Sequence, residues 1–177
     1  MRQSEGLGMM QKDNRTIAFV CTGNTCRSPM AEAIFNDMAE KNGVCVRAES
    51  FGIATSTGLP VSENSVIACK EIGIDLSGKA STAVADAGIE KYEKFYCMSQ
   101  SHAKMLMQFF LVQPEKIAVL GISDPYGGDI EVYRHCRDEI VNSGNFIFRQ
   151  KQHYPKRATS AFTDVTLYNQ NTLLLCI

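Results

Sequence analysis

Residues 16–32 constrain the fold more than any other part of the chain, because they join a strand to a helix through a short loop. The apolar run from Ile17 to Val20 predicts a buried strand. A polar loop follows, in which Gly23 can adopt backbone angles that other residues avoid. Ser28 is a favoured N-cap and Pro29 a favoured first helical residue, so we expect a helix to begin there.

A loop of this kind predicts a binding site for an oxyanion. Its backbone N–H groups converge on one point, and the helix dipole adds partial positive charge there. Cys21 lies at the rim, where the field that binds a phosphate dianion also stabilises a thiolate, the form of cysteine that attacks. Arg27 offers a planar fork that can hold two phosphoryl oxygens. We therefore expect Cys21 to be a nucleophile and Arg27 an anion ligand. A buried core thiol is the alternative for Cys21, and the strand–loop–helix context argues against it.

The composition excludes several classes of protein. A chain of 177 residues with 45% hydrophobic and 21% charged residues is typical of one globular domain. The net charge of −1 argues against a nucleic-acid partner. No apolar stretch approaches the roughly 20 residues of a membrane span, and we see no export signal, so we expect a cytoplasmic protein without a membrane partner. The seven cysteines lack paired metal-type spacing, so we expect reduced thiols, no metal and no cofactor.

Strand and helix patterns alternate along the chain. We expect strands at 16–21, Val44–Ser50, Phe95–Met98 and Ile117–Leu120, and helices at Pro29–Asn42, Pro60–Ile72, Thr82–Lys91, Ser101–Phe110 and Asp129–Asn142. This alternation predicts parallel pairing with right-handed crossovers. We expect an α/β three-layer sandwich, with a four-stranded parallel sheet of order 2-1-3-4 and helices on both faces. Ligands of such sheets bind at the carboxyl ends of the strands, beside the point where the strand order reverses.

A second candidate catalytic segment follows the fourth strand, at the same sheet edge as Cys21. Asp124 precedes Pro125 in a glycine-rich loop, which is also a common way to start a turn. Beside a cysteine nucleophile, we expect Asp124 to protonate the leaving group and then to activate water. Tyr126 is expected to form a wall of the pocket and to stack on a flat substrate.

Two motifs carry a resemblance to a known family. The segment Val20–Pro29, which reads VCTGNTCRSP, resembles the signature of the low-molecular-weight protein tyrosine phosphatases. The segment Asp124–Gly128 resembles the general-acid loop of that family. The resemblance covers residues 16–142 and is closest to the bacterial protein-arginine phosphatases. It implies a protein phosphatase that acts on phosphoarginine, phosphotyrosine or both through a phosphocysteine intermediate.

The same resemblance assigns roles within the loop. The residues expected to bind phosphate are Thr22, Gly23, Asn24, Thr25, Cys26 and Ser28. Asn24 is expected to fix the shape of the loop, and Ser28 to hydrogen-bond the sulfur. The resemblance also implies that Cys26 forms a protective disulfide with Cys21, with a structural role for Cys26 as the alternative. We expect phosphorylated proteins as substrates, and inorganic phosphate or another oxyanion as a ligand of the loop.

Thr25, Phe51 and Tyr126 are the predicted substrate pocket. Tyrosine phosphatases of the family usually carry an aliphatic residue where Thr25 stands, whereas the arginine phosphatases resemble this chain. The Thr25 hydroxyl should favour the guanidinium of a bound phosphoarginine over the phenyl ring of a bound phosphotyrosine, so we expect phosphoarginine to be preferred. Phe51 departs from the family's Ser-Ala-Gly turn, and it either shapes the pocket or packs elsewhere.

Two other functions and the chain ends complete the interpretation. One alternative function is arsenate reduction, which needs a further pair of closely spaced thiols, whereas the cysteines after Cys26 are far apart in the sequence. The other alternative is a module that binds phosphate but does not catalyse a reaction. His102 lies on the first turn of a helix, and we expect it to be exposed or to cap that helix. A catalytic role is the alternative, which the absence of a partner nearby in the sequence argues against. We expect a flexible tail at 1–15, the phosphatase domain at 16–142 and a divergent extension at 143–177, because residues 142–145 should break the last helix.

Overall fold

The computed structural model describes residues 15–150. Its centre is a parallel sheet, whose strands are β1 (Arg15–Cys21), β2 (Val46–Gly52), β3 (Lys94–Cys97) and β4 (Ile117–Val119). The strand order is β2-β1-β3-β4, which confirms the predicted topology. Because the strands are parallel, the loops that follow β1 and β4 emerge at the same edge of the sheet. The strand order reverses between β1 and β3, and ligands bind beside such a point.

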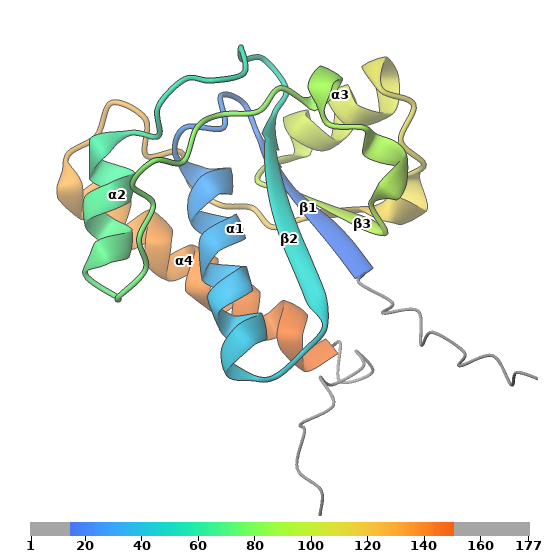
Figure 1. The fold of residues 1–177 in the computed structure, drawn as a ribbon. Coiled ribbons are helices and arrows are strands. Elements are labelled where there is room, and N and C mark those ends of the chain that lie inside the picture. Colours follow the sequence, from blue (N-terminus) through green and yellow to red (C-terminus); the bar gives the residue numbers. More distant parts are fainter. Residues whose placement is uncertain (1–14, 151–177) are drawn as a thin grey trace, which may run out of the picture.

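Helices cover both faces of this sheet (Figure 1). The helices are α1 (Arg27–Lys41), α2 (Glu63–Lys70), α3 (Gln100–Phe109) and α4 (Ile130–Gln150). α1, α2 and α4 pack together on one face, whereas α3 packs against β3 and β4 on the other. Short 3-10 turns at Val84–Asp86, Ile89–Lys91 and Pro114–Lys116 complete the described chain. No helix within residues 15–150 is both long and apolar enough to cross a membrane.

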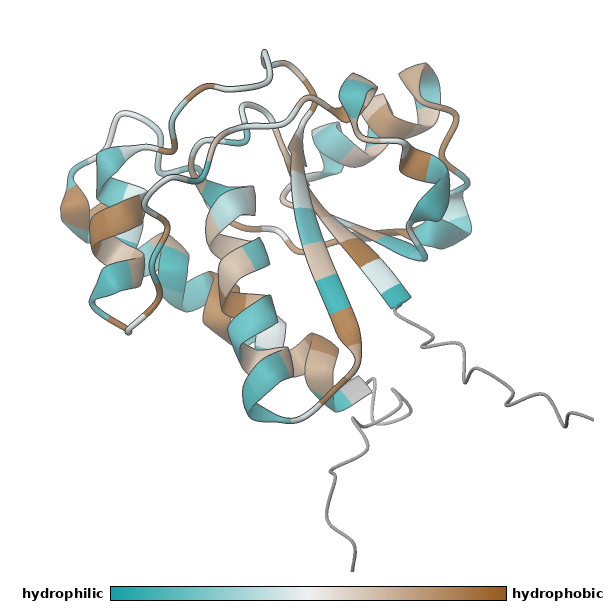
Figure 2. Ribbon diagram, viewed as in Figure 1, coloured by the Kyte–Doolittle hydropathy of each residue, from teal (hydrophilic) through white to brown (hydrophobic). Residues whose placement is uncertain are grey.

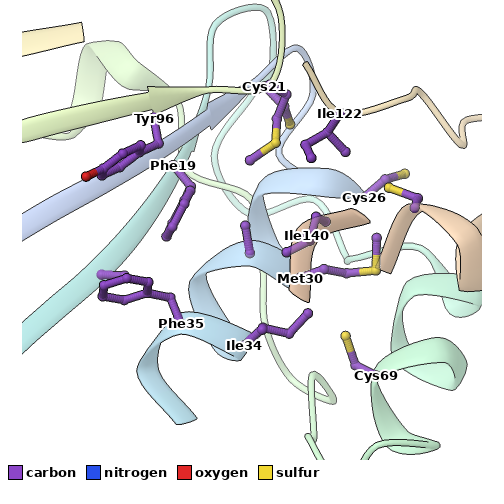
Figure 3. Packing of buried hydrophobic residues seen from close by; sticks show 14 of the residues in the cluster. Phe19, Cys21, Cys26, Met30, Ile34, Phe35, Cys69, Tyr96, Ile122 and Ile140 are labelled. Carbon is purple, nitrogen blue, oxygen red and sulfur yellow. The ribbon is translucent and has the colours of Figure 1, made fainter. Parts of the chain in front are cut away.

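Side-chain alternation along the strands divides the core into two layers. Ile17 and Phe19 of β1 are buried on the α1 side, whereas Ala18 and Val20 are buried on the α3 side. Along β2, hydrophobic and hydrophilic residues alternate instead, as Figure 2 shows. In the first layer the Phe19 ring meets the Phe35 ring of α1 edge-on at 5.7 Å, as Figure 3 shows. The two layers hold the sheet edge, and the loops on it, in a fixed position.

Two local predictions were wrong. The predicted helix Thr82–Lys91 consists of two 3-10 turns, because Gly88 between them has a left-handed backbone with φ of 58°. Ser28 is not the N-cap of α1, since the helix begins two residues earlier than predicted, at Arg27, and its N-cap is Cys26. The Ser28 hydroxyl therefore remains available for the loop. The other predicted helices and strands are present, with ends that differ by a few residues.

The predicted break at residues 142–145 was also wrong, because α4 continues to Gln150. Tertiary packing outweighs the weak helix propensity of this stretch. Ile147 is 3% exposed, and the Phe148 ring packs at a tilt against the Phe35 ring, with the ring centroids 4.9 Å apart. A side chain at Gly144 would come within 3.1 Å of the Met38 sulfur, so the glycine lets α4 approach α1 closely. Arg15, predicted as part of the tail, is the first residue of β1. The rest of the predicted tail and the part of the extension after residue 150 lie outside the described residues.

Ile147 offers a test of whether the last turns of α4 stabilise the fold. Ile147→Ala should lower the free energy of unfolding by about 2–4 kcal/mol, because it opens a cavity in the core. Phe146 is 62% exposed, so Phe146→Ala should change it by less than about 0.5 kcal/mol. Urea unfolding measures both variants. Equal values would show that this part of α4 is not packed as described.

Candidate active site

The loop between β1 and α1 is held from outside through its carbonyl groups. Three of them accept hydrogen bonds from backbone N–H groups of neighbouring segments. The pairs are Cys21 with Ile53 (3.0 Å), Thr22 with Ala54 (2.9 Å) and Thr25 with Ser62 (2.9 Å). In a trans peptide the N–H of the next residue points away from the carbonyl, so we expect the N–H groups that follow these three carbonyls to point towards the inside of the loop. N–H groups turned inward at a helix N-terminus attract an anion.

Asn24 holds the same loop from within. Its side chain is fully buried, and its backbone has a positive φ of 52°, which asparagine tolerates better than most residues. The amide Nδ2 donates to Ser28 Oγ at 2.8 Å and to Ser50 Oγ at 2.9 Å. Its Oδ1 accepts from the backbone N–H of Thr82 at 2.7 Å. Asn24 therefore connects the loop to α1, to β2 and to the segment that precedes the first 3-10 turn.

The end of β2 lies directly against the loop. A Cβ at Gly52 would come within 2.9 Å of the Gly23 carbonyl carbon and 3.0 Å of the Asn24 nitrogen. Both distances are too short for a side chain, so glycine is required for this close approach. Ser50, two residues earlier, donates to Glu32 Oε2 at 2.6 Å, and the ammonium group of Lys79 pairs with the same carboxylate. The hydrogen bonds of Asn24 thus continue into a partly buried ion pair.

The sulfur of Cys21 lies where these contacts meet. It accepts a hydrogen bond from the backbone N–H of Asn24 at 3.2 Å and lies 3.0 Å from Ser28 Oγ. Either the sulfur or the Ser28 hydroxyl can be the donor between them, and the hydroxyl also lies 3.4 Å from the Phe51 carbonyl oxygen. A thiolate has no proton, so the hydroxyl is the donor when Cys21 is ionised. Two donors aimed at one sulfur stabilise negative charge on it.

Arg27 and Asp124 form an ion pair in the lining of a pocket of about 280 Å³. Nη2 of Arg27 donates to Oδ2 of Asp124 at 2.5 Å, and the two side chains are 7% and 53% exposed. The loop after β4 thus brings its carboxylate over the loop after β1. The pocket is lined by Cys21, Thr22, Gly23, Thr25, Cys26, Arg27, Asp124 and Tyr126. Within residues 15–150, no group of three or more His, Cys, Asp or Glu side chains is placed to hold a metal ion.

A family model described as "Low molecular weight phosphotyrosine protein phosphatase" matches residues 16–153. The chain belongs to this family. A protein-arginine-phosphatase of Bacillus subtilis (strain 168) is 34% identical over 133 residues, which are 70% of this chain and 88% of that protein. The chain is thus a cysteine-dependent protein phosphatase.

Solved structures give the same assignment. A YwlE arginine phosphatase has a TM-score of 0.73 at 31% identity, covering 76% of this chain and 94% of that one. A low-molecular-weight protein tyrosine phosphatase from T. tengcongensis has a TM-score of 0.74 at 31% identity, covering 77% of this chain and 99% of that one. Relatives of similar identity therefore include both arginine and tyrosine phosphatases.

Phe51 of this phosphatase does not line the pocket that the sequence assigned to it. It is 3% exposed and packs in the α3-side core, where its ring meets Tyr92 at 5.2 Å. Phe51 pairs in register with Val20, and both side chains belong to that layer. The packing alternative is therefore the correct one. The other two predicted pocket residues, Thr25 and Tyr126, do line the pocket.

Cys26 points away from α3, towards α2 and α4. Its sulfur lies 3.3 Å from the hydroxyl of Tyr133 and 3.6 Å from Ser62 Oγ. Burial and the contact with Cys26 raise the pKa of Tyr133 to about 12, so its hydroxyl keeps its proton. Cys21 and Cys26 are both free thiols, and a disulfide between them stays a prediction.

His102, which the sequence analysis expected to be exposed or to cap its helix, is instead buried beside the pocket. It is 4% exposed, and its Nε2 lies 2.9 Å from the hydroxyl of Thr22, 80 positions earlier in the chain. Its Nδ1 lies 3.0 Å from Ser99 Oγ. Burial and the charge of Arg27 lower the pKa of His102 to about 4, so the ring is neutral at physiological pH. The one available signal was its place on the first turn after β3, the strand beside β1.

The lowered pKa of His102 predicts how stability depends on pH. A histidine in an unfolded chain titrates near pH 6.5. Between about pH 6.5 and 4, His102 is therefore protonated in the unfolded chain and neutral in the folded chain. The free energy of unfolding should therefore fall as the pH is lowered through this window. His102→Gln removes the titrating ring, so its stability should fall less than that of the wild type. Urea unfolding at pH 7 and pH 4.5 measures the two losses, and equal losses would contradict the prediction.

Proposed function

We propose that this phosphatase hydrolyses phosphoarginine in proteins through a phosphocysteine at Cys21, with phosphotyrosine as a second substrate. The observation that carries the proposal is the arrangement of Cys21, Arg27 and Asp124 around one pocket. A nucleophile, an anion ligand and a candidate proton donor are the groups that phosphoryl transfer without a metal requires.

In the first step the sulfur of Cys21 attacks phosphorus in line with the leaving group. An S–P bond forms as the P–N bond of phosphoarginine, or the P–O bond of phosphotyrosine, breaks. Asp124, once its ion pair with Arg27 is broken and it has taken up a proton from solvent, gives that proton to the departing nitrogen or oxygen. Arg27 and the inward N–H groups hold the three equatorial oxygens, where charge spreads in the transition state. The incoming phosphoryl group takes the Arg27 donors and so releases Asp124 to the leaving group.

In the second step a water molecule attacks the phosphocysteine. The Asp124 carboxylate accepts a proton from the water, and the S–P bond breaks to release phosphate and the thiolate of Cys21. The Ser28 hydroxyl, 3.0 Å from the sulfur, stabilises the departing thiolate. A relative supports the covalent route, since one solved YwlE arginine phosphatase is a cysteine-to-serine mutant with a phosphorylated active-site serine.

The preference for phosphoarginine rests on Thr25. Its side chain lines the pocket, and its hydroxyl contacts the Cys26 sulfur at 3.7 Å. A hydroxyl in the wall is a hydrogen-bonding group for a guanidinium N–H, whereas a phenyl ring gains nothing from it. Tyr126, 81% exposed at the mouth, offers a flat face to either substrate.

The described residues argue against the two alternatives. Arsenate reduction passes a disulfide between thiols that must attack as thiolates. Burial raises the pKa of Cys69, Cys97 and Cys136 to about 12 each, so these thiols stay protonated at neutral pH. An inactive phosphate-binding module would have no need of a carboxylate over the loop, and Asp124 lies there.

Cys21→Ser should abolish the hydrolysis of an aryl phosphate, because a serine hydroxyl is a far weaker nucleophile in this site. Cys45→Ser is the matched control, since Cys45 is a partly exposed thiol outside the pocket, and it should keep wild-type kcat/KM. Release of inorganic phosphate measures both variants. Turnover by Cys21→Ser would exclude the proposed nucleophile.

Thr25→Ile should lower the ratio of kcat/KM for phosphoarginine over phosphotyrosine peptides by about tenfold, because it replaces a polar wall with an apolar one. Thr25→Ser keeps the hydroxyl and should leave the ratio close to that of the wild type. Steady-state assays on matched peptides give both values. A ratio that Thr25→Ile leaves unchanged would remove Thr25 as the source of the preference.

A further inference from the structure

His102 is a buried polar side chain beside the pocket that the reaction steps above do not use. It belongs to α3, whose N-cap is Ser99, and α3 lies on the opposite face of the sheet from α1. The ring is 4% exposed, and each of its nitrogens lies within 3.0 Å of a hydroxyl oxygen, of Thr22 on one side and Ser99 on the other. A ring buried and bonded at both nitrogens has one orientation.

A neutral ring has one N–H group and one lone pair. The nitrogen that faces Thr22 therefore either donates to its hydroxyl or accepts from it, and the other nitrogen does the reverse with Ser99. Each tautomer thus fixes the direction in which the Thr22 hydroxyl presents its own proton or lone pairs. Both ring nitrogens are hydrogen-bonded to hydroxyl groups of the protein, so neither is directed at a substrate. Any effect of His102 on the substrate therefore passes through the Thr22 hydroxyl.

Thr22 is well placed to pass this constraint to a substrate. It follows Cys21 directly and lines the pocket. Its carbonyl is fixed by the N–H of Ala54 at 2.9 Å, which leaves its side chain as the movable part. Among the described residues, His102 is the hydrogen-bond partner of the Thr22 hydroxyl. Without that bond, the hydroxyl of an exposed threonine turns freely among its rotamers.

We propose that His102 is a positioning residue, which holds the Thr22 hydroxyl at the mouth of the phosphate pocket and so strengthens the binding of the phosphorylated substrate. The proposal rests on the phosphatase function above, and it concerns substrate binding rather than the choice between phosphoarginine and phosphotyrosine. A fixed hydroxyl contributes to binding without the loss of rotamer entropy that a mobile one suffers when substrate arrives.

Two amide substitutions separate the two contacts of the ring. The amide nitrogen and oxygen of glutamine lie two bonds beyond Cγ, as Nε2 of histidine does. His102→Gln can therefore keep the hydrogen bond with Thr22. The amide nitrogen and oxygen of asparagine lie one bond beyond Cγ, as Nδ1 of histidine does. His102→Asn can therefore keep the hydrogen bond with Ser99, but it loses the hydrogen bond with Thr22. We expect His102→Asn to raise KM for an aryl phosphate, and the inhibition constant of inorganic phosphate, by about five- to tenfold. His102→Gln should stay within about twofold of the wild type in both.

A double-mutant cycle with Thr22→Val tests whether the effect passes through the hydroxyl. In the Thr22→Val background, His102→Asn should change KM by less than about twofold. An unreduced effect in that background, or equal losses in His102→Gln and His102→Asn, would overturn the proposal. The acid limb of kcat/KM should coincide in the wild type and His102→Gln, and a shift would mean that His102 titrates during turnover.

Thermal unfolding of each variant separates a binding defect from a folding defect. If His102→Asn does not fold, the comparison of wild type, His102→Gln and Thr22→Val decides: Thr22→Val must raise KM while His102→Gln does not. Aryl phosphate and inorganic phosphate are used as probes, so a wild type that fails on phosphoarginine peptides counts against the proposed substrate alone. A wild type that fails on the aryl phosphate counts against the proposed reaction.

Discussion

The rest of the site depends on the buried hydrogen bonds of Asn24. A loop that turns its N–H groups inward is electrostatically unfavourable by itself, because parallel dipoles and a left-handed residue must be held together. The Asn24 amide contributes three hydrogen bonds to this end, and it is fully buried. A buried polar group left without a partner costs about 1–3 kcal/mol, so these bonds strongly favour one shape of the loop.

The sheet brings two further segments to this loop, the loop after β4 and the first turn of α3. β1 and β4 are separated by β3, and all strands are parallel, so the loops after β1 and β4 emerge at the same edge. The carboxylate of Asp124 therefore reaches Arg27, although 97 positions separate them in the chain. The first turn of α3 reaches Thr22 through His102 in the same way. Each approach follows from the strand order and the two packed core layers.

The two sides of the loop have different chemical character. On the pocket side, Cys21 and Arg27 meet an exposed carboxylate and the exposed ring of Tyr126. On the inner side, the Cys26 sulfur meets the hydroxyl of Tyr133, whose raised pKa keeps it protonated. Charge that changes during phosphoryl transfer is thus kept on the pocket side, while neutral hydrogen-bonding groups support the loop from behind.

The sequence by itself determined the features that are local or periodic. The strand, loop and helix at residues 16–32 and the alternation of strands and helices follow from patterns that adjacent residues carry. The roles of Cys21, Arg27 and Asp124 stay predictions, which rest on residue type, spacing and the resemblance of the two motifs to the family. Only the tertiary structure decided the burial of Phe51, the partners of His102 and the continuation of α4 through Ile147. Those outcomes depend on contacts between segments far apart in the chain, and local propensity carries no information about which surfaces will meet.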